Sequence, residues 1–245
     1  MLNFLKRAIR RRHEPNGDYL GIGRSAGDAH YRAYVGPPHD YDLVAAMCFN
    51  LLTTIGLRQH HRLLDVGCGS LRLGRLFIPY LNVGRYVGVE PNAWLVDEGI
   101  RKETGAEQIR IKRPVFLFDS SPEIILGQGP FDFAVAQSIF SHCGQDLIRG
   151  WLHGLRPVLS PAGVLVATYL PSDQDSTSPG WTYPGCVSYR PETLRNLAEE
   201  EGFRMVLLDW RHPRQSWVAF LQTATPSQWF ENKSLTWNEH PSFQV

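Results

Sequence analysis

The stretch LLDVGCGS, residues 63–70, joins a short apolar run to a turn with glycines at 67 and 69. A run with helical spacing of its apolar residues follows, from Leu71 to Leu81. Glycine lets the backbone approach a ligand closely, and the amide groups at the start of a helix point toward such a ligand. The stretch therefore predicts a strand–turn–helix unit with a ligand bound at its turn.

Strand and helix patterns alternate around this unit. Apolar runs predict further strands at 85–90, 114–119, 131–140 and 163–170, and apolar spacing predicts helices at 41–56, 92–105, 146–161 and 190–202. In the first of these helices Leu43, Ala46, Met47, Leu51 and Ile55 share one face. Strands separated by helices imply a parallel α/β sheet. Two last strands, 203–210 and 216–224, are only five residues apart and are predicted to pair as an antiparallel hairpin.

Composition and charge limit the classes of protein that remain. The chain has 245 residues, of which 43% are hydrophobic and 20% are charged, and this balance is typical of a folded globular protein. Lys+Arg 25 against Asp+Glu 24 gives a net charge of +1, so no overall attraction to nucleic acid is expected. We find no apolar run long enough to span a bilayer. The four cysteines are far apart without a CxxC pair, so no metal site or disulfide framework is expected, and reduced thiols favour a cytoplasmic protein; they are Cys48, Cys68, Cys143 and Cys186.

Two cofactor classes use a glycine turn of this kind. Dinucleotide enzymes prefer G-x-G-x-x-G, and the third glycine of that pattern falls here at Arg72, so it fails. Methyltransferases that use S-adenosylmethionine (SAM) prefer an acid two residues before the first glycine and then G-x-G-x-G. Asp65, Gly67 and Gly69 fit that pattern, while Leu71 replaces its third glycine, so the helix is expected to begin without backbone freedom at that point.

Four motifs in order, DVGCG, RYVGVEPN, FDFAVAQSIFSH and LSPAGVLVATYL, resemble those of class I SAM-dependent methyltransferases of the small-molecule type. The resemblance covers about residues 40–223. It implies a Rossmann-like seven-stranded sheet of order 3-2-1-4-5-7-6 with strand 7 antiparallel, flanked by helices, and SAM lying across the carboxyl ends of its strands.

The resemblance also implies which residues hold SAM. Glu90 is expected to bind the ribose, Asp119 the adenine, and Gln137 to lie near the sulfonium. Asp65 and Asp119 have a structural alternative as caps of the turns that follow them. The full expected cofactor set is Asp65, Gly67, Cys68, Gly69, Glu90, Pro91, Asn92, Asp119 and Gln137.

The methyl acceptor is expected to be a small molecule that presents a hydroxyl. The Asn/Asp-Pro-Pro-aromatic run of enzymes that methylate planar nitrogens is absent after the fourth strand. His142 is the candidate general base, because imidazole titrates near neutral pH, and His212 is a weaker one. Aromatic residues in two long segments, 15–40 and 171–189, are predicted to form lids over the acceptor; they are Tyr31, Tyr34, Trp181 and Tyr183. Arg24, Arg32 and Arg190 flank these segments and either clamp an anionic acceptor or are solvated.

Alternative functions stay open at this point. One is a protein or nucleic-acid methyltransferase, and the other is a non-catalytic partner subunit with the SAM fold, which the Leu71 departure makes conceivable. We divide the chain into a basic segment and lid arm (1–39), the methyltransferase domain (40–223) and a tail (224–245). The basic end is either solvated or a membrane-surface helix, and the sequence leaves the oligomeric state undefined.

Overall fold

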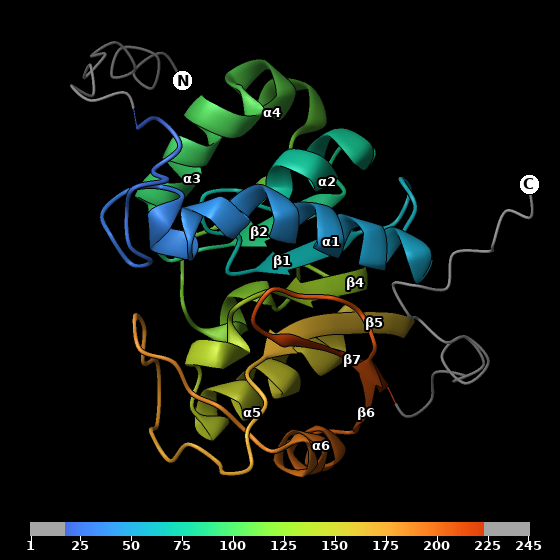
Figure 1. Ribbon diagram of the computed structural model, residues 1–245. Helices are drawn as coiled ribbons and strands as arrows, with labels where there is room; N and C mark the ends of the chain where they lie inside the picture. The colour runs from blue at the N-terminus through green and yellow to red at the C-terminus, as the bar shows by residue number, and fades with distance from the viewer. Residues whose placement is uncertain (1–17, 223–245) are drawn as a thin grey trace, which may run out of the picture.

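The computed structural model describes residues 18–222, so the basic end and the tail lie outside the described residues. Seven strands form one sheet in the order β3-β2-β1-β4-β5-β7-β6 (Figure 1). Strand β7 is antiparallel to both of its neighbours, and the pairs β3–β2, β2–β1, β1–β4 and β4–β5 are parallel. This confirms the predicted architecture. The strands are β1 Leu63–Val66, β2 Tyr86–Val89, β3 Val115–Leu117, β4 Phe131–Ala136, β5 Leu159–Tyr169, β6 Phe203–Leu208 and β7 Ser216–Gln222.

Helices cover both faces of the sheet (Figure 1). One face carries α1 Tyr41–Thr54, α2 Gly74–Tyr80, α3 Ala93–Gly99, the π-helix η3 Ile100–Thr104 and α4 Ala106–Lys112. The other carries α5 Gln145–Leu155 and α6 Pro191–Glu200. Each face has its own apolar core, with Phe77 and Trp217 in the first and Phe140 and Phe220 in the second. Short 3₁₀ helices lie at Ala33–Val35, Pro38–Asp40, Pro122–Ile125, Phe140–His142 and Arg156–Val158.

The predicted helix 146–161 is too long. Helix α5 ends at Leu155, and β5 already begins at Leu159, where it pairs with Phe131 of β4. Pro157 and Pro161 lack the amide hydrogen that a continuing α-helix needs. The chain therefore leaves the helix early and enters the sheet four residues before the predicted strand.

The buried face of α1 agrees with the prediction at Met47, Leu51 and Ile55, and differs from it elsewhere. Leu43 is 46% exposed and Ala46 is exposed, whereas Val44, Ala45 and Cys48 are buried. The predicted and the observed buried residues both have helical spacing, because α1 carries apolar side chains along more than one stripe of its surface. Packing against the sheet selected the stripe that includes Tyr41, whose hydroxyl reaches the glycine turn.

Within residues 18–222 no helix is long and apolar enough to cross a membrane. The same part of the chain holds no group of three or more His, Cys, Asp or Glu side chains arranged as metal ligands. Its four cysteines are free thiols, and only Cys186 is exposed.

Candidate cofactor and acceptor site

A cavity of about 600 Å³ opens where β1, β2 and β4 end. The parallel strands bring residues distant in sequence to the same edge of the sheet, as expected for such folds. Most of the predicted cofactor set lines the cavity together: Gly67, Gly69, Glu90, Pro91, Asn92, Asp119 and Gln137. Asp65 and Cys68 do not line it, but border a small adjoining hollow that shares Gly67, Gly69 and Arg72 with it.

The glycine turn is tightly packed and left-handed. Gly67 has φ 70° and Gly69 has φ 53°. A Cβ atom at Gly67 would collide with the side chain of Ile139, and one at Gly69 would lie 2.7 Å from Val35 Cγ1. Leu71 has φ 62° in spite of its side chain, so the chain does use backbone freedom where the third glycine is missing. The helix expected from Leu71 starts only at Gly74.

Glu90 ties the glycine turn to the end of β2. Gly69 N–H donates to Glu90 Oε2 (3.1 Å), and Asn92 donates its backbone and side-chain N–H groups to Oε1 (both 2.8 Å). Burial raises the pKa of Glu90, and these three hydrogen bonds oppose the rise. Because Oε1 already accepts two hydrogen bonds and Oε2 only one, Oε2 has the lone pair that is open to a ribose hydroxyl.

Asp65 is buried beneath the turn rather than in the cavity. Its Oδ2 accepts a hydrogen bond from the Tyr86 hydroxyl (2.6 Å). Burial raises the pKa of Asp65 to about 7, against the lowering effects of the Tyr86 hydroxyl and the Arg72 charge. Asp65 therefore supports the base of the turn, and its expected role toward SAM stays a prediction.

Arg72 is the residue of this site that sequence reasoning missed. Its guanidinium is buried, lines the cavity, and donates to the carbonyl of Val35 (3.0 Å) and to Gln137 Oε1. Burial lowers the pKa of Arg72, although its guanidinium stays charged at neutral pH. No carboxylate within residues 18–222 forms an ion pair with it. The Asp65 charge acts on this guanidinium without a direct ion pair, so the guanidinium fits a further carboxylate such as the one at the amino-acid end of SAM.

Asp119 and Gln137 lie on opposite sides of the cavity. Asp119 Oδ1 accepts the backbone N–H of Ser121 (2.9 Å), while Ser121 itself caps the short helix that follows. Gln137 Nε2 donates to Ser138 Oγ (2.7 Å), and Ser138 adopts a left-handed backbone with φ 59°. The N-cap of the short helix Pro122–Ile125 is therefore Ser121 and not Asp119, and the adenine contact of Asp119 stays a prediction.

The lid arm and the long loop meet over the cavity. The Tyr183 hydroxyl donates to the carbonyl of Tyr34, and the two ring centroids are 5.3 Å apart. Tyr34 also packs against Trp94, at 5.2 Å between centroids. Tyr34, Trp181 and Tyr183 line the cavity as predicted for an acceptor wall, but Tyr31 does not.

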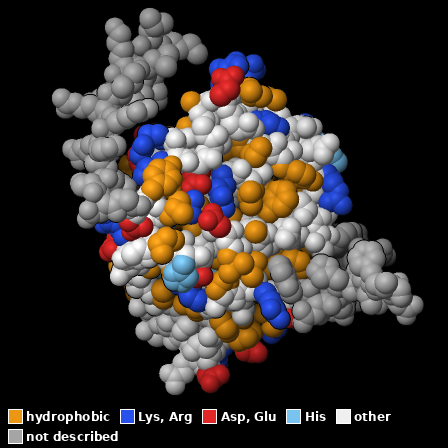
Figure 2. All heavy atoms as spheres, turned by 45° about the horizontal axis from the view of Figure 1, so that its top comes forward, with side chains coloured by type: hydrophobic (Ala, Val, Ile, Leu, Met, Phe, Trp, Pro, Cys, Tyr) orange, Lys and Arg blue, Asp and Glu red, His pale blue; other side chains and the backbone are white. Residues whose placement is uncertain are grey.

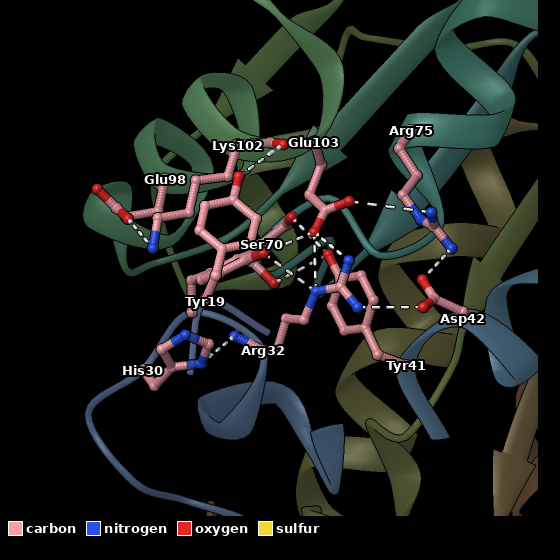
Figure 3. A network of polar contacts seen from close by, with 11 residues as sticks. Tyr19, His30, Arg32, Tyr41, Asp42, Ser70, Arg75, Glu98, Lys102 and Glu103 are labelled. Atoms are coloured by element: carbon pink, nitrogen blue, oxygen red, sulfur yellow. Dashed lines mark hydrogen bonds and ion pairs between the residues drawn. The ribbon is translucent and has the colours of Figure 1, made fainter. Parts of the chain in front are cut away.

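Tyr31 instead hydrogen-bonds to a polar network that fastens the arm to α1, α2 and η3. Figure 3 shows Arg32, Asp42, Arg75 and Glu103 of this network. The Tyr31 hydroxyl donates to Glu103 Oε1 (2.8 Å), which also accepts Arg32 Nη2 (2.6 Å). Arg32 and Glu103 have only 6% and 7% of their side chains exposed, so this ion pair is buried. Asp42 bridges Arg32 and Arg75 at 3.1 and 2.7 Å. Arg32 is thus neither solvated nor directed at an acceptor.

Two histidines, His142 and His212, lie near the end of β4 and are neutral in different tautomers. His142 lines the cavity, and its Nδ1 lies 2.6 Å from the Gly185 carbonyl oxygen. A carbonyl only accepts, so Nδ1 carries the hydrogen and Nε2 has the lone pair. Burial lowers the pKa of His142, which keeps the ring neutral at pH 7. His212 Nδ1 instead accepts the backbone N–H groups of Arg214 and Gln215 (3.1 and 2.9 Å), and burial lowers its pKa to about 3. Its remaining nitrogen holds the hydrogen, so His212 has no lone pair to offer.

Comparisons with known proteins agree with this geometry. Residues 64–165 match a protein family described as a methyltransferase domain. An uncharacterized methyltransferase of Schizosaccharomyces pombe is 29% identical over 110 residues, which cover 44% of this chain and 39% of the relative. The chain thus spans about two fifths of the length of that curated relative.

Solved structures share the fold at low sequence identity. Magnesium protoporphyrin IX methyltransferase from Synechocystis, with bound SAH, superposes with a TM-score of 0.57 at 13% identity, over 84% of this chain and 93% of that one. A SAM-dependent methyltransferase from Leishmania major gives 0.60 at 17% identity, over 83% and 81%. Residues 64–165 therefore match a methyltransferase domain, and the chain has the same fold as these SAM-dependent methyltransferases.

Proposed function

We propose that the protein transfers the methyl group of SAM to a hydroxyl of a small molecule, with His142 as the general base. The observation that carries this proposal is the hydrogen bond from His142 Nδ1 to the Gly185 carbonyl. It fixes the tautomer in which Nε2 accepts a proton, on a ring that lines the cofactor cavity. A methyltransferase needs such a base only when the nucleophile must lose a proton, as a hydroxyl does.

The chain's own residues supply position and proton transfer. When bound, SAM supplies an activated methyl group on a sulfonium. Glu90 and Arg72 would hold its ribose and its carboxylate. The backbone of 180–187 holds His142 and the lid together, since Thr182 N–H donates to the His142 carbonyl (2.9 Å) and Val187 N–H to that of Ser141 (2.8 Å). Alignment of this kind contributes up to about 7–11 kcal/mol in favourable systems.

A small acceptor is supported by the enclosure of the cavity and by surface charge. Tyr34 and Tyr183 join the arm and the loop across it. On the described part of the face in Figure 2, Lys and Arg side chains are interspersed with Asp and Glu, without a broad basic patch. Arg190, the other flanking cation, binds Asp175 at 2.8 Å.

The test uses the full chain and SAM labelled on its methyl group, incubated with a cell extract split into small molecules and macromolecules. Label is expected in the small-molecule fraction, in an alkali-stable ether. Label found in protein or nucleic acid would overturn the substrate assignment. No S-adenosylhomocysteine with either fraction would favour the partner-subunit alternative.

His142→Ala is expected to lower turnover about 10²–10⁴-fold while SAM affinity stays unchanged. His153→Ala is the matched control, because His153 lies on α5 with 82% of its side chain exposed. In the wild type, kcat should fall only when the pH drops below the ordinary histidine pKa of about 6.5, since protonation removes the Nε2 lone pair. A variant with full turnover would leave alignment alone as the source of catalysis.

A further inference from the structure

Five aromatic rings line the cavity. They belong to Tyr34, His142, Trp151, Trp181 and Tyr183. The centroids of Trp181 and Tyr183 are 6.1 Å apart with 25° between their planes, and His142 lies 5.5 and 5.1 Å from them. The rings come from the arm, the segment after β4, α5 and the long loop, so the fold brings four separate elements together to make one aromatic wall.

The aromatic wall is held rigidly next to the base. Trp181 pairs with Cys143 in a short antiparallel bridge, and Gly144 N–H donates to the Gly180 carbonyl (2.7 Å). Gly180 N–H in turn donates to Asp146 (3.0 Å). Trp181 is nevertheless 53% exposed, so much of its ring is not covered by other side chains. An indole fixed at its backbone and open on its surface is suited to stack on a ligand.

No charged side chain lines the cavity among the rings in the described part of the chain, and Arg214, whose charge helps to lower the pKa of His142, is paired with Asp40 at 3.3 Å. Among the described residues that line the cavity, the permanently charged types are Arg72, Glu90 and Asp119, which lie on the side of the glycine turn and strand ends. Arg32 forms an ion pair with Glu103, and Arg190 forms one with Asp175. An anionic or cationic acceptor would therefore lose its hydration without gaining a partner, which is unfavourable.

The proton state of His142 limits which class of hydroxyl this residue can deprotonate. Burial holds its pKa below the ordinary value, so it is a weak base. The pKa of a phenolic hydroxyl is near that of tyrosine, about 10, whereas the pKa of an alkanol resembles that of water, about 15.7. The phenol therefore differs much less in pKa from the imidazole. General-base catalysis is most effective when the pKa values of the proton donor and the proton acceptor differ least.

We infer that the methyl acceptor is an uncharged aromatic compound with a ring hydroxyl, stacked on Trp181 and Tyr183 beside His142. This inference rests on the proposed function and names its substrate class. In the balanced step the phenolic oxygen gains the methyl carbon, the sulfonium–methyl bond breaks to leave a neutral thioether, and the phenolic proton passes to His142 Nε2.

The experiment compares three probes of one size: 2-naphthol, decahydro-2-naphthol and 3-hydroxy-2-naphthoate. Calorimetry with the full chain saturated with S-adenosylhomocysteine measures binding without chemistry. We expect 2-naphthol to bind about 3- to 10-fold more tightly than its saturated analogue, as ring–ring contacts provide. The carboxylate should bind most weakly of the three.

Two variants link this preference to the aromatic wall. Trp181→Leu should bring the ratio between 2-naphthol and decahydro-2-naphthol close to one, and Trp181→Phe should restore it, while S-adenosylhomocysteine affinity is the same in both. No binding by 2-naphthol, equal binding of the saturated alcohol, or tightest binding of the carboxylate would overturn the inference. Those outcomes with intact S-adenosylhomocysteine binding leave the methyltransferase proposal standing, whereas loss of SAM-dependent transfer to every acceptor contradicts that proposal instead.

Discussion

Leu71 is a residue whose backbone and side chain are in conflict. Its φ of 62° lies where a Cβ atom is strained, yet the side chain is fully buried against Gly74 and Gly99. A left-handed conformation costs a non-glycine residue about 1–2 kcal/mol. Truncating a buried leucine costs about 2–5 kcal/mol. The free energy gained by burying the leucine side chain therefore exceeds the cost of its left-handed backbone. This difference explains why the turn can have leucine in place of a third glycine.

We predict that Leu71→Gly is more stable than Leu71→Ala by about 1 kcal/mol, because only glycine relieves the strain. Leu73 is the matched control, being equally buried but with φ −85°. At Leu73 the order should reverse, since glycine is the weaker residue in a helical conformation. Urea denaturation of the four variants measures both differences. The same order at both positions would contradict the strain at Leu71.

Glu90 lines the cavity at the end of β2, and its contact with the ribose stays a prediction. Glu90→Ala should weaken SAM binding about 10- to 100-fold, the effect of losing a charge-assisted hydrogen bond of about 1.5–3 kcal/mol. Glu107→Ala on α4 is the control, because that side chain is 69% exposed. Calorimetry with SAM measures affinity, and circular dichroism verifies folding. A folded Glu90 variant with wild-type affinity would remove Glu90 from the ribose site.

Single residues were predictable from sequence where a backbone requirement restricted the residue type. Gly67 and Gly69 have positive φ and no room for a Cβ, so the sequence shows the requirement directly. Arg72 was used only to reject the dinucleotide pattern. Its importance comes from burial beside Val35 and Gln137, 37 and 65 residues away in the sequence, and no local pattern reports such contacts.

At the scale of elements, the arm supports the glycine turn from outside. Val35 packs on Gly69, its carbonyl accepts Arg72, and the hydroxyl of Tyr41 donates to the Ser70 carbonyl (2.9 Å). The Arg32–Glu103 pair holds this arm against η3 (Figure 3). The arm therefore borders the cavity through Tyr34 and Val35, and its role as a lid over the acceptor stays a prediction.

We predict that Tyr41→Phe weakens SAM binding about 2- to 10-fold, the range of one neutral hydrogen bond. The loss frees the Ser70 carbonyl and loosens the turn. Tyr80→Phe is the matched control, because its hydroxyl also donates to a backbone carbonyl, that of Leu57 (3.2 Å), away from the turn. Equal SAM affinities for the two variants would show that the Tyr41 contact is structural only.

Helices and strands are predictable from the sequence where one face of the element is buried. Strong apolar spacing located α5 and α6, and apolar runs located the central strands. Helix α4 was missed because none of its residues is buried, so it carries no apolar stripe. The π-helix was merged with α3, since one extra residue per turn leaves no local signal.

At the scale of the whole molecule, the order of motifs is sufficient to predict the strand order of the sheet, but it does not predict how the arm and the loop meet over the cavity. Strand order follows from the family resemblance, and the structure confirms it. Contact between the arm and the loop joins Tyr34 to Tyr183 across 149 positions. Such a contact depends on how far each segment folds back over the sheet, which spacing within either segment does not specify.

Asp65 couples the stability of the whole fold to pH. Its pKa is about 7 in the folded protein and near the ordinary 3.8 in the unfolded chain, because only the folded state buries it. Between these values the native state keeps a proton that the unfolded state has lost. Stability from this group is therefore full below about pH 4 and declines as the pH rises toward 7, by linkage.

Asp65→Asn removes that dependence while it keeps an oxygen for the Tyr86 hydroxyl. We expect the free energy of unfolding of the wild type, minus that of the variant, to fall steadily from pH 4 to 7 and to stay constant above 7. Taking the difference cancels the opposite trend of His142 and His212, whose lowered pKa values make the fold more stable as the pH rises. Urea unfolding at unit pH steps from 4 to 8 measures it. A difference that stays constant from pH 4 to 8 would mean that the folded protein keeps Asp65 ionised, with its charge stabilised by the nearby Arg72.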